Sequence, residues 1–224
     1  MRALGFGLAG LLALPLAGFA ELAYAKRLRD ARLVFEEVMG ISDKAIPQSL
    51  LDKAQCVVIV PGMKKGAFIF GARYGRGFLN CRVTGGPGWT PPAAVRIEGG
   101  SFGLQVGGKE TDVILLVMNE KGASRLMTSQ FTLGGQASVA AGPVGRTASA
   151  ETDALLSAEI LSWSRSRGVF AGISLQGATL RQDLGVNRQM YGRTMENREV
   201  IEQKPKAPAA AEGLLAVLNR YSSR

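Results

Sequence analysis

The stretch that decides the fold runs from Cys56 to Pro92 and reads CVVIVPGMKKGAFIFGARYGRGFLNCRVTGGPGWTPP. It opens with an unbroken apolar run, residues 56–60, which is typical of a strand buried on both faces. The pair Pro61-Gly62 is expected to end that strand. A period-two alternation over residues 67–74 then predicts a second strand. Gly75 and Gly77 are expected to reverse the chain into a returning strand over residues 78–83, so the stretch predicts a glycine-rich hairpin.

Basic side chains gather at the turns and ends of this predicted hairpin and of a later one around residues 166–168. Cations beside an apolar, glycine-rich sheet form a surface that suits anions. We therefore expect six residues to meet an anionic partner: Lys64, Lys65, Arg73, Arg76, Arg165 and Arg167.

Composition sets the outer limits. The chain has 224 residues, 46% of them hydrophobic, which is enough for one domain with a sizeable core and short extensions. An excess of 27 Lys+Arg over 18 Asp+Glu gives a formal charge of +9, which favours an anionic partner and is equally compatible with solubility alone. The sequence has no histidine, so the usual metal ligand and the usual general base at neutral pH are missing.

The N-terminus resembles an export signal over residues 1–25. Arg2 precedes an apolar run from Ala3 to Ala20, and Ala23-Tyr24-Ala25 supplies a cleavage site; cleavage after Ala20 is a second option. The alternative is an uncleaved membrane anchor. The expected location is the periplasm or cell envelope, with the protein either released or anchored by this segment.

Residues 26–39 predict an amphipathic helix that ends at Gly40. Its apolar face carries Leu28, Ala31, Phe35 and Val38 at helical spacing. Two interpretations stay open: Leu28, Phe35 and Val38 insert into a membrane, or this face docks on the core of the domain.

The rest of the chain predicts further strands between helices. We expect a helix over residues 47–54, strands over 93–98, 101–107, 112–118 and 133–141, a helix over 123–130, and a hairpin of 160–165 with 169–175. Trp89 is expected to anchor the core. The prolines in residues 204–208 indicate a linker before a last helix, residues 209–221. The predicted fold is α+β: a curved, mainly antiparallel sheet, barrel-like or sandwich-like, flanked by N- and C-terminal helices. Residues 26–198 would form the domain, followed by the linker and helix in 199–224.

The two cysteines, Cys56 and Cys81, allow two interpretations. They are either buried free thiols or, in an oxidising compartment, a disulfide between strands of one sheet. Two cysteines without histidine do not make a zinc site, so no metal is expected.

Motifs that look catalytic fail on their context. The G-x-G-x-x-G of residues 5–10 lies in the export segment, and the G-x-x-x-x-G-K of residues 103–109 is followed by Glu110 instead of Ser or Thr. Ser101 lies in a G-x-S-x-G match but has no histidine to take its proton. Acidic pairs such as Glu110 with Asp112, or Glu151 with Asp153, are interpreted as solvated charge. No catalytic residue and no cofactor is expected, and no nucleic-acid-binding pattern is present.

Glycine-centred blocks follow one another in the chain; they include VVIVP, KKGAFIFGARYGRG, GWTPP, SFGLQVGG, AAGPVGR and SRSRGVFAGISLQGATL. In this order, over about residues 30–195, they resemble the SYLF domain family. The resemblance implies a non-enzymatic lipid-binding module, associated with phosphoinositides and actin in eukaryotes and exported in bacteria. For an exported protein we expect phosphatidylglycerol, cardiolipin or glycolipid phosphates as ligands. The alternative is a structural or protein-interaction module of the envelope with a protein partner.

Overall fold

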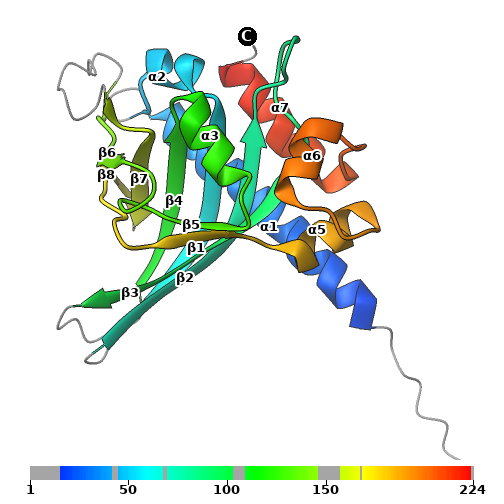
Figure 1. Cartoon of the computed structure of the whole chain (residues 1–224), viewed down its shortest axis with the longest axis horizontal. Helices are drawn as coiled ribbons and strands as arrows, with labels where there is room; N and C mark the ends of the chain where they lie inside the picture. The colour runs from blue at the N-terminus through cyan, green and yellow to red at the C-terminus, as the bar shows by residue number, and fades with distance from the viewer. Residues whose placement is uncertain are drawn as a thin grey trace, which may run out of the picture.

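The computed structural model describes residues 16–41, 45–67, 70–102, 109–145, 157–166 and 168–222. A curled sheet forms half a barrel, and helices cover its outside and close its ends (Figure 1). Its strands are β1 (Cys56–Ala67), β2 (Phe70–Cys81), β3 (Ala93–Phe102), β4 (Lys109–Val117), β5 (Gln130–Thr132), β6 (Val139–Ala141), β7 (Ile160–Ser166), β8 (Val169–Gly172) and β9 (Thr179–Gln182). The helices are α1 (Leu16–Gly40), α2 (Gln48–Lys53), α3 (Glu120–Leu126), α5 (Leu184–Tyr191), α6 (Asn197–Gln203), the 3-10 turn η1 (Ala209–Ala211) and α7 (Glu212–Tyr221).

The strand order is β5-β9-β3-β2-β1-β4-β7-β6, and β8 also pairs with β7. All pairings between the named strands are antiparallel except that of β6 with β7. The predicted class, α+β with a curved and mainly antiparallel sheet flanked by terminal helices, is confirmed.

Each face of the sheet packs against its own core. The outer face carries Val57 and Ile59 and meets α1 and α7, while the inner face carries Val58 and Val60 and fills the curl of the sheet. This arrangement explains the unbroken apolar run at the start of β1, because neighbouring residues point to opposite faces and both faces are buried. The prediction of a doubly buried strand is confirmed.

The strand does not end at Pro61-Gly62, which corrects the sequence prediction. β1 continues to Ala67 with one extra residue, because the pairing to β2 shifts between Ile59 and Lys64. The pairing to β4 shifts at the same place, between Val60 and Met63. Gly62 has a φ of 58°, which favours glycine, and its backbone N–H donates to Asp112 Oδ1 at 2.9 Å. The pair therefore forms a β-bulge.

Gly75 and Gly77 do not reverse the chain either. They lie inside the single strand β2, opposite the bulge. A Cβ on Gly75 would lie 2.6 Å from Val60 Cγ1, and one on Gly77 would lie 2.0 Å from the carbonyl oxygen of Ile59. Glycine is therefore required for close approach of two strands instead of for a turn. β1 ends at Ala67 and β2 begins at Phe70, and residues 68–69 between them lie outside the described residues.

Other boundaries also differ from the prediction. Gly99-Gly100 does not split two strands, because β3 runs through it; a Cβ on Gly99 would lie 3.1 Å from the Cα of Ala178, so glycine allows a close approach there. The short strands β5 and β9 and the helices α5 and α6 were not expected. The hairpin of β7 and β8 and the last helix are confirmed, and Trp89 is a buried anchor whose Nε1 donates to the carbonyl oxygen of Ser222 at 2.8 Å.

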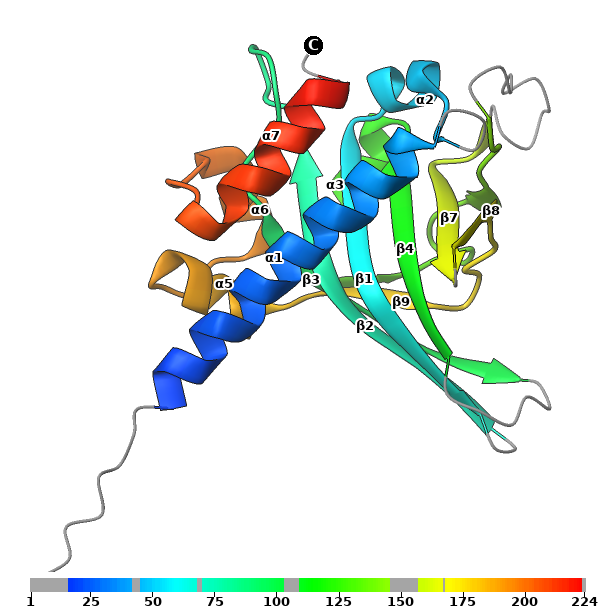
Figure 2. The ribbon, with the colours of Figure 1, turned by 180° about the vertical axis from the view of Figure 1, so that it is seen from behind.

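Helix α1 crosses the outer face of the sheet beside α7 (Figure 2). Leu28, Phe35 and Val38 are fully buried in the outer core, and the ring of Phe35 meets that of Tyr221 edge to face at 6.0 Å. The docking interpretation is therefore correct. The insertion interpretation is corrected, since these three side chains are covered by the protein itself.

The helix begins at Leu16, earlier than the predicted start at residue 26. Both expected cleavage positions thus lie inside α1, and Tyr24 is buried in the outer core. The first fifteen residues of the predicted signal lie outside the described residues. No helix in the described part of the chain has both the length and the apolar composition to cross a bilayer.

Candidate functional site

The β-bulge divides the predicted basic residues between the two faces of the sheet. Lys65 and Arg73 lie directly opposite each other on β1 and β2, on the inner face. Lys64 faces outward, as do Arg76 and Arg165. Arg167 lies outside the described residues. The expected group of six cations is therefore not one surface, because side chains alternate along a strand.

The three outward cations have carboxylate partners. Lys64 Nζ lies 4.0 Å from Glu110, Arg76 lies 3.3 Å from Asp183, and Arg165 lies 2.9 Å from Asp112 and also pairs with Glu37. Burial lowers the pKa of the Arg165 guanidinium and raises the pKa of the Asp112 carboxyl.

A cavity of about 550 Å³ lies between α1 and the sheet beside this network. Its charged lining residues are three cations and four carboxylates: Lys26, Arg27, Arg165, Asp30, Glu37, Glu110 and Asp112. Carboxylates outnumber cations, so this cavity does not favour an anion.

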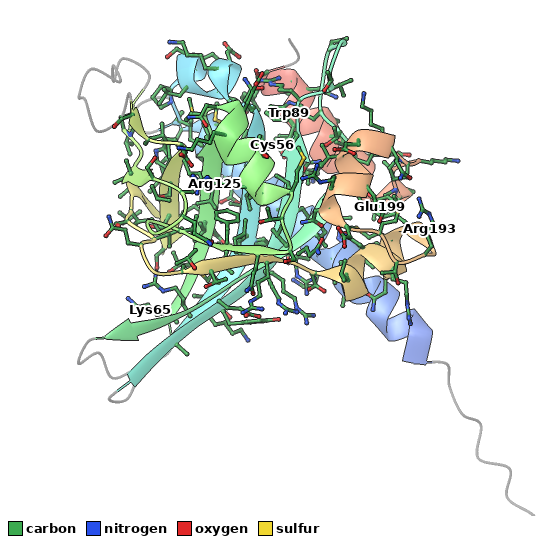
Figure 3. All side chains as sticks on the ribbon, viewed as in Figure 1. Cys56, Lys65, Trp89, Arg125, Arg193 and Glu199 are labelled. Carbon is green, nitrogen blue, oxygen red and sulfur yellow. A yellow bond between two sulfur atoms is a disulfide. The ribbon has the colours of Figure 1, made fainter. Side chains whose placement is uncertain are left out.

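The inner cavity differs in its charge. It has a volume of about 300 Å³ and is lined by Met63, Lys65, Arg73, Thr111, Ser164, Ile173, Ser174 and Leu175. We call this set the inner cavity. Lys65 lies toward the protruding end of the β1–β2 ribbon (Figure 3). Two cations and three hydroxyl side chains line it, and none of its lining residues is acidic. This combination suits a phosphate group.

The side chain of Arg73 lies beside a glycine of the next strand. Arg73 lies opposite Gly99 of β3, and a Cβ on Gly99 would lie 3.5 Å from Arg73 Cγ. The Nε atom of Arg73 is buried and has no hydrogen-bond partner among the described residues. A buried donor without a partner is costly, so a bound acceptor would satisfy it.

Sequence analysis does not identify the hydroxyl residues of the inner cavity as site residues. Thr111 and Ser164 come from β4 and β7, and Ser174 follows β8. One signal is available in the sequence: Thr111 lies two and four residues before Val113 and Leu115 on a buried strand, so its side chain points to the same inner face. A polar residue at such a position is unusual in a core and therefore indicates a site. The meeting of β4, β7 and the segment after β8 depends on tertiary structure.

The described residues contain no group of three or more His, Cys, Asp or Glu side chains that could hold a metal ion. At the end of the ribbon away from Lys65, Cys56 and Cys81 lie opposite each other and form a disulfide with an S–S distance of 2.05 Å. Of the two interpretations of the cysteines, the structure shows the disulfide.

Comparison with known proteins gives a family for this architecture. Residues 98–221, more than half of the chain, match the family model Ysc84, described as "Las17-binding protein actin regulator". That match includes Thr111, Ser164 and Ser174 of the inner cavity. The description of this family thus names the binding of a protein, Las17, and the regulation of actin.

Related proteins extend the match toward the N-terminus. An SH3 domain-containing protein of Schizosaccharomyces pombe is 36% identical over 182 residues, 80% of this chain and 42% of its own length. SH3 domain-containing YSC84-like protein 1 of Xenopus laevis is 31% identical over 203 residues, covering 88% of this chain and 60% of its own. LAS seventeen-binding protein 3 of Saccharomyces cerevisiae is 32% identical over 186 residues, covering 81% and 40%. The chain thus spans between about two fifths and three fifths of these relatives. The family match and these relatives agree with the SYLF resemblance of the sequence blocks, and the chain belongs to the Ysc84 (SYLF) family.

Proposed function

We propose that this protein is a non-enzymatic module that binds anionic phospholipid headgroups in the inner cavity. The observation that carries the proposal is the charge of that cavity: Lys65 and Arg73 face each other across β1 and β2, and none of the described residues that line the cavity is acidic. Arginine binds phosphate oxygens through a planar fork of donors, and lysine acts as a point charge.

The size of the cavity limits what it holds. A volume of about 300 Å³ is at the lower end of small-molecule sites, so it fits a phosphorylated headgroup and not a complete acyl chain. Met63, Ile173 and Leu175 supply apolar contact beside the polar groups. In this arrangement the headgroup enters the cavity while the lipid tails stay in the bilayer.

Vesicle sedimentation tests the proposal. Purified protein is mixed with phosphatidylglycerol vesicles or with phosphatidylcholine vesicles at about 150 mM salt, where long-range attraction is screened. We expect sedimentation with the anionic vesicles only. The variant Lys65→Gln/Arg73→Gln should lose about 2 kcal/mol, or about thirtyfold in affinity, at about 1 kcal/mol per basic residue.

The matched control is Lys53→Gln/Lys206→Gln, which removes the same charge from two exposed positions outside the cavity. It should bind anionic vesicles about as well as the wild type. Equal sedimentation of the wild type with both kinds of vesicle, or equal loss in both variants, would refute a headgroup site in the inner cavity.

A second function is favoured by the names of the relatives. LAS seventeen-binding protein 3 is named for binding a protein, and the family description also names a protein partner. We propose that this chain likewise binds a partner protein, at a surface other than the inner cavity. An envelope protein is the expected partner if the chain is exported.

We also propose that the protein works in an oxidising compartment of the cell envelope. The Cys56–Cys81 disulfide supports this, because disulfides persist where thiols are not kept reduced, and so does the resemblance of residues 1–25 to an export signal. Thiol alkylation in intact cells should label neither cysteine until a reductant is added. Labelling of both without reductant would exclude that location.

A further inference from the structure

A row of three arginines crosses the outer face of the sheet. Arg76 on β2 lies directly opposite Arg96 on β3, and Arg96 lies directly opposite Arg181 on β9. Residues that oppose each other on adjacent strands share a face, and adjacent strands are about 4.8 Å apart, so the row spans about 10 Å. We call these three residues the arginine row.

The arginine row is unfavourable for stability by itself, because like charges directly opposite each other on neighbouring strands repel. Two carboxylates offset part of this repulsion. Glu98 pairs with Arg96 at 2.7 Å and with Arg181 at 3.1 Å, and Asp183 pairs with Arg76 at 3.3 Å. Positive charge is left over.

A further cation lies beside the row. Arg27 of α1 has a lowered pKa, first because burial disfavours its charge and next because the charge of Arg76 repels it. Arg27 thus adds a fourth guanidinium group at the Arg76 end of the row, where the charges of Asp183 and Asp30 partly offset it. Arg27 remains a cation, because a guanidinium group is not deprotonated in proteins.

The arginine row is open to a ligand but recessed at one end. The side chains of Arg76, Arg96 and Arg181 are 42%, 34% and 40% exposed. Residues of α1 and α5 stand beside Arg76 and enclose with it a cavity of about 210 Å³. The Arg76 end of the row is therefore recessed, a shape that suits an inserted side chain of a partner protein better than a flat bilayer surface.

We propose that the arginine row binds an acidic segment of a partner protein. Carboxylates pair with guanidinium groups through two parallel hydrogen bonds. Acidic side chains three or four residues apart on a helix are about 5–6 Å apart, which is close to the strand spacing that separates the arginines. The inference rests on the second function proposed above and adds to it the surface and the chemistry of the partner.

A fluorescent polyglutamate peptide of about eight residues tests the inference by titration at about 150 mM salt. The wild type should bind it, and Arg96→Gln/Arg181→Gln should bind it at least about tenfold more weakly, since two charge-assisted pairs are lost. A polyglutamine peptide of the same length should not bind. Lys53→Gln/Lys206→Gln, with the same net charge as the arginine variant, should stay within about twofold of the wild type.

A gain of binding supplies a sharper readout. Glu98→Gln removes the carboxylate that competes for Arg96 and Arg181, so it should strengthen peptide binding by about threefold or more. The same change leaves two opposed arginines without their shared partner, so its melting temperature should fall. A substitution that merely damaged the fold would weaken binding and stability together.

Three results would overturn the inference: no binding of polyglutamate by the wild type, equal weakening in the two charge-matched variants, or unchanged binding in Arg96→Gln/Arg181→Gln. Loss of anionic-vesicle binding in the arginine variant, with peptide binding intact, would assign the row to membranes instead. If a purified partner binds the wild type and this variant equally, protein binding stands and the arginine row is not its surface. Lys65→Gln/Arg73→Gln should keep peptide binding, so the lipid proposal is tested separately.

Discussion

The two ends of the β1–β2 ribbon have the same strands and opposite properties. At one end Cys56 and Cys81 are buried, with 1% and 4% of their surface exposed, and a disulfide joins them. At the other end Lys65 and Arg73 oppose each other in the same pairing and line a cavity. The covalently joined, apolar end fixes the ribbon to the core. The charged end is thereby held in place although Lys65 and Arg73 themselves add little apolar burial.

The β-bulge at Pro61-Gly62 separates the two ends. Before it, the inward side chains of β1 are even-numbered, as with Val58 and Val60; after it they are odd-numbered, as with Met63 and Lys65. One inserted residue thus moves every later side chain of β1 to the opposite face of the sheet. Without the bulge, Lys64 and not Lys65 would point into the curl of the sheet.

The largest effect on stability is expected at the end of the ribbon that the Cys56–Cys81 disulfide closes. Cys56→Ala/Cys81→Ala should lower the free energy of unfolding by about 3.5 kcal/mol, because the disulfide closes a loop with a sequence separation of 25 residues. Urea unfolding measures this. A reductant should destabilise the wild type by a similar amount and leave the variant unchanged.

Binding of anionic vesicles should survive that substitution wherever the variant is still folded, since the inner cavity lies at the other end. Loss of binding by a folded Cys56→Ala/Cys81→Ala protein would show that the two ends are coupled.

The next effect concerns the close approach of β2 to the bulge. Gly77→Ala should destabilise the fold by about 2 kcal/mol, because its Cβ would meet backbone atoms of Ile59 and Val60 at 2.0–2.8 Å, and backbone cannot move aside cheaply. Gly66→Ala, in the same ribbon, is the control: nothing lies within 4 Å of its Cβ, and it should be nearly neutral. A neutral Gly77→Ala in urea unfolding would contradict the tight packing described for the bulge.

The same glycines explain why part of the fold could be predicted and part could not. The doubly buried start of β1 follows from residues 56–60, and the amphipathic helix follows from the spacing of Leu28, Phe35 and Val38. Sequence alone gives glycine two roles, turn or close approach, and the choice at Gly75 and Gly77 depends on which strand lies next to them. Local pattern does not contain that information.

The candidate site was half predictable for a related reason. Lys65 and Arg73 were included among the cations, but so were Lys64, Arg76 and Arg165, which face outward and meet carboxylates. The extra residue of the β-bulge decides which of these cations face inward and which face outward. The sequence alone does not reveal that bulge, because Pro61-Gly62 indicates a strand end just as well. The hydroxyls of the inner cavity come from distant segments, which only the tertiary fold brings together.

A smaller effect tests directly which side chains of β1 face inward after the β-bulge. Lys65→Gln should weaken binding to anionic vesicles by about fivefold, which corresponds to about 1 kcal/mol for one basic residue. Lys64→Gln should change it by less than about twofold, because Lys64 faces outward beside Glu110 and its charge is screened. The two variants have the same net charge, and vesicle sedimentation compares them. A larger loss in Lys64→Gln than in Lys65→Gln would mean that Lys64, and not Lys65, faces the inner cavity.

The smallest effect concerns Asp112, which holds the bulge from β4 by accepting the Gly62 N–H. Burial raises the pKa of Asp112 above its ordinary 3.8, and the charges of Asp30 and Glu110 add to the rise, while the Gly62 hydrogen bond opposes it. The folded protein therefore keeps this proton to higher pH than the unfolded chain does. The contribution of this carboxyl to stability is greatest below pH 3.8 and is lost as the pH rises through the folded-state pKa.

Asp112→Asn removes this titration but keeps an oxygen that can accept the Gly62 N–H. The stability of the wild type relative to the variant should therefore decrease as the pH rises from about 3 to 6, by less than one proton's linkage of about 1.4 kcal/mol per pH unit. Urea midpoints across that range give the slope. Arg165, 2.9 Å from Asp112, acts in the other direction by favouring the ionised carboxylate. A relative stability that increases with pH would mean that this ion pair, and not burial, sets the charge state of the residue that holds the bulge.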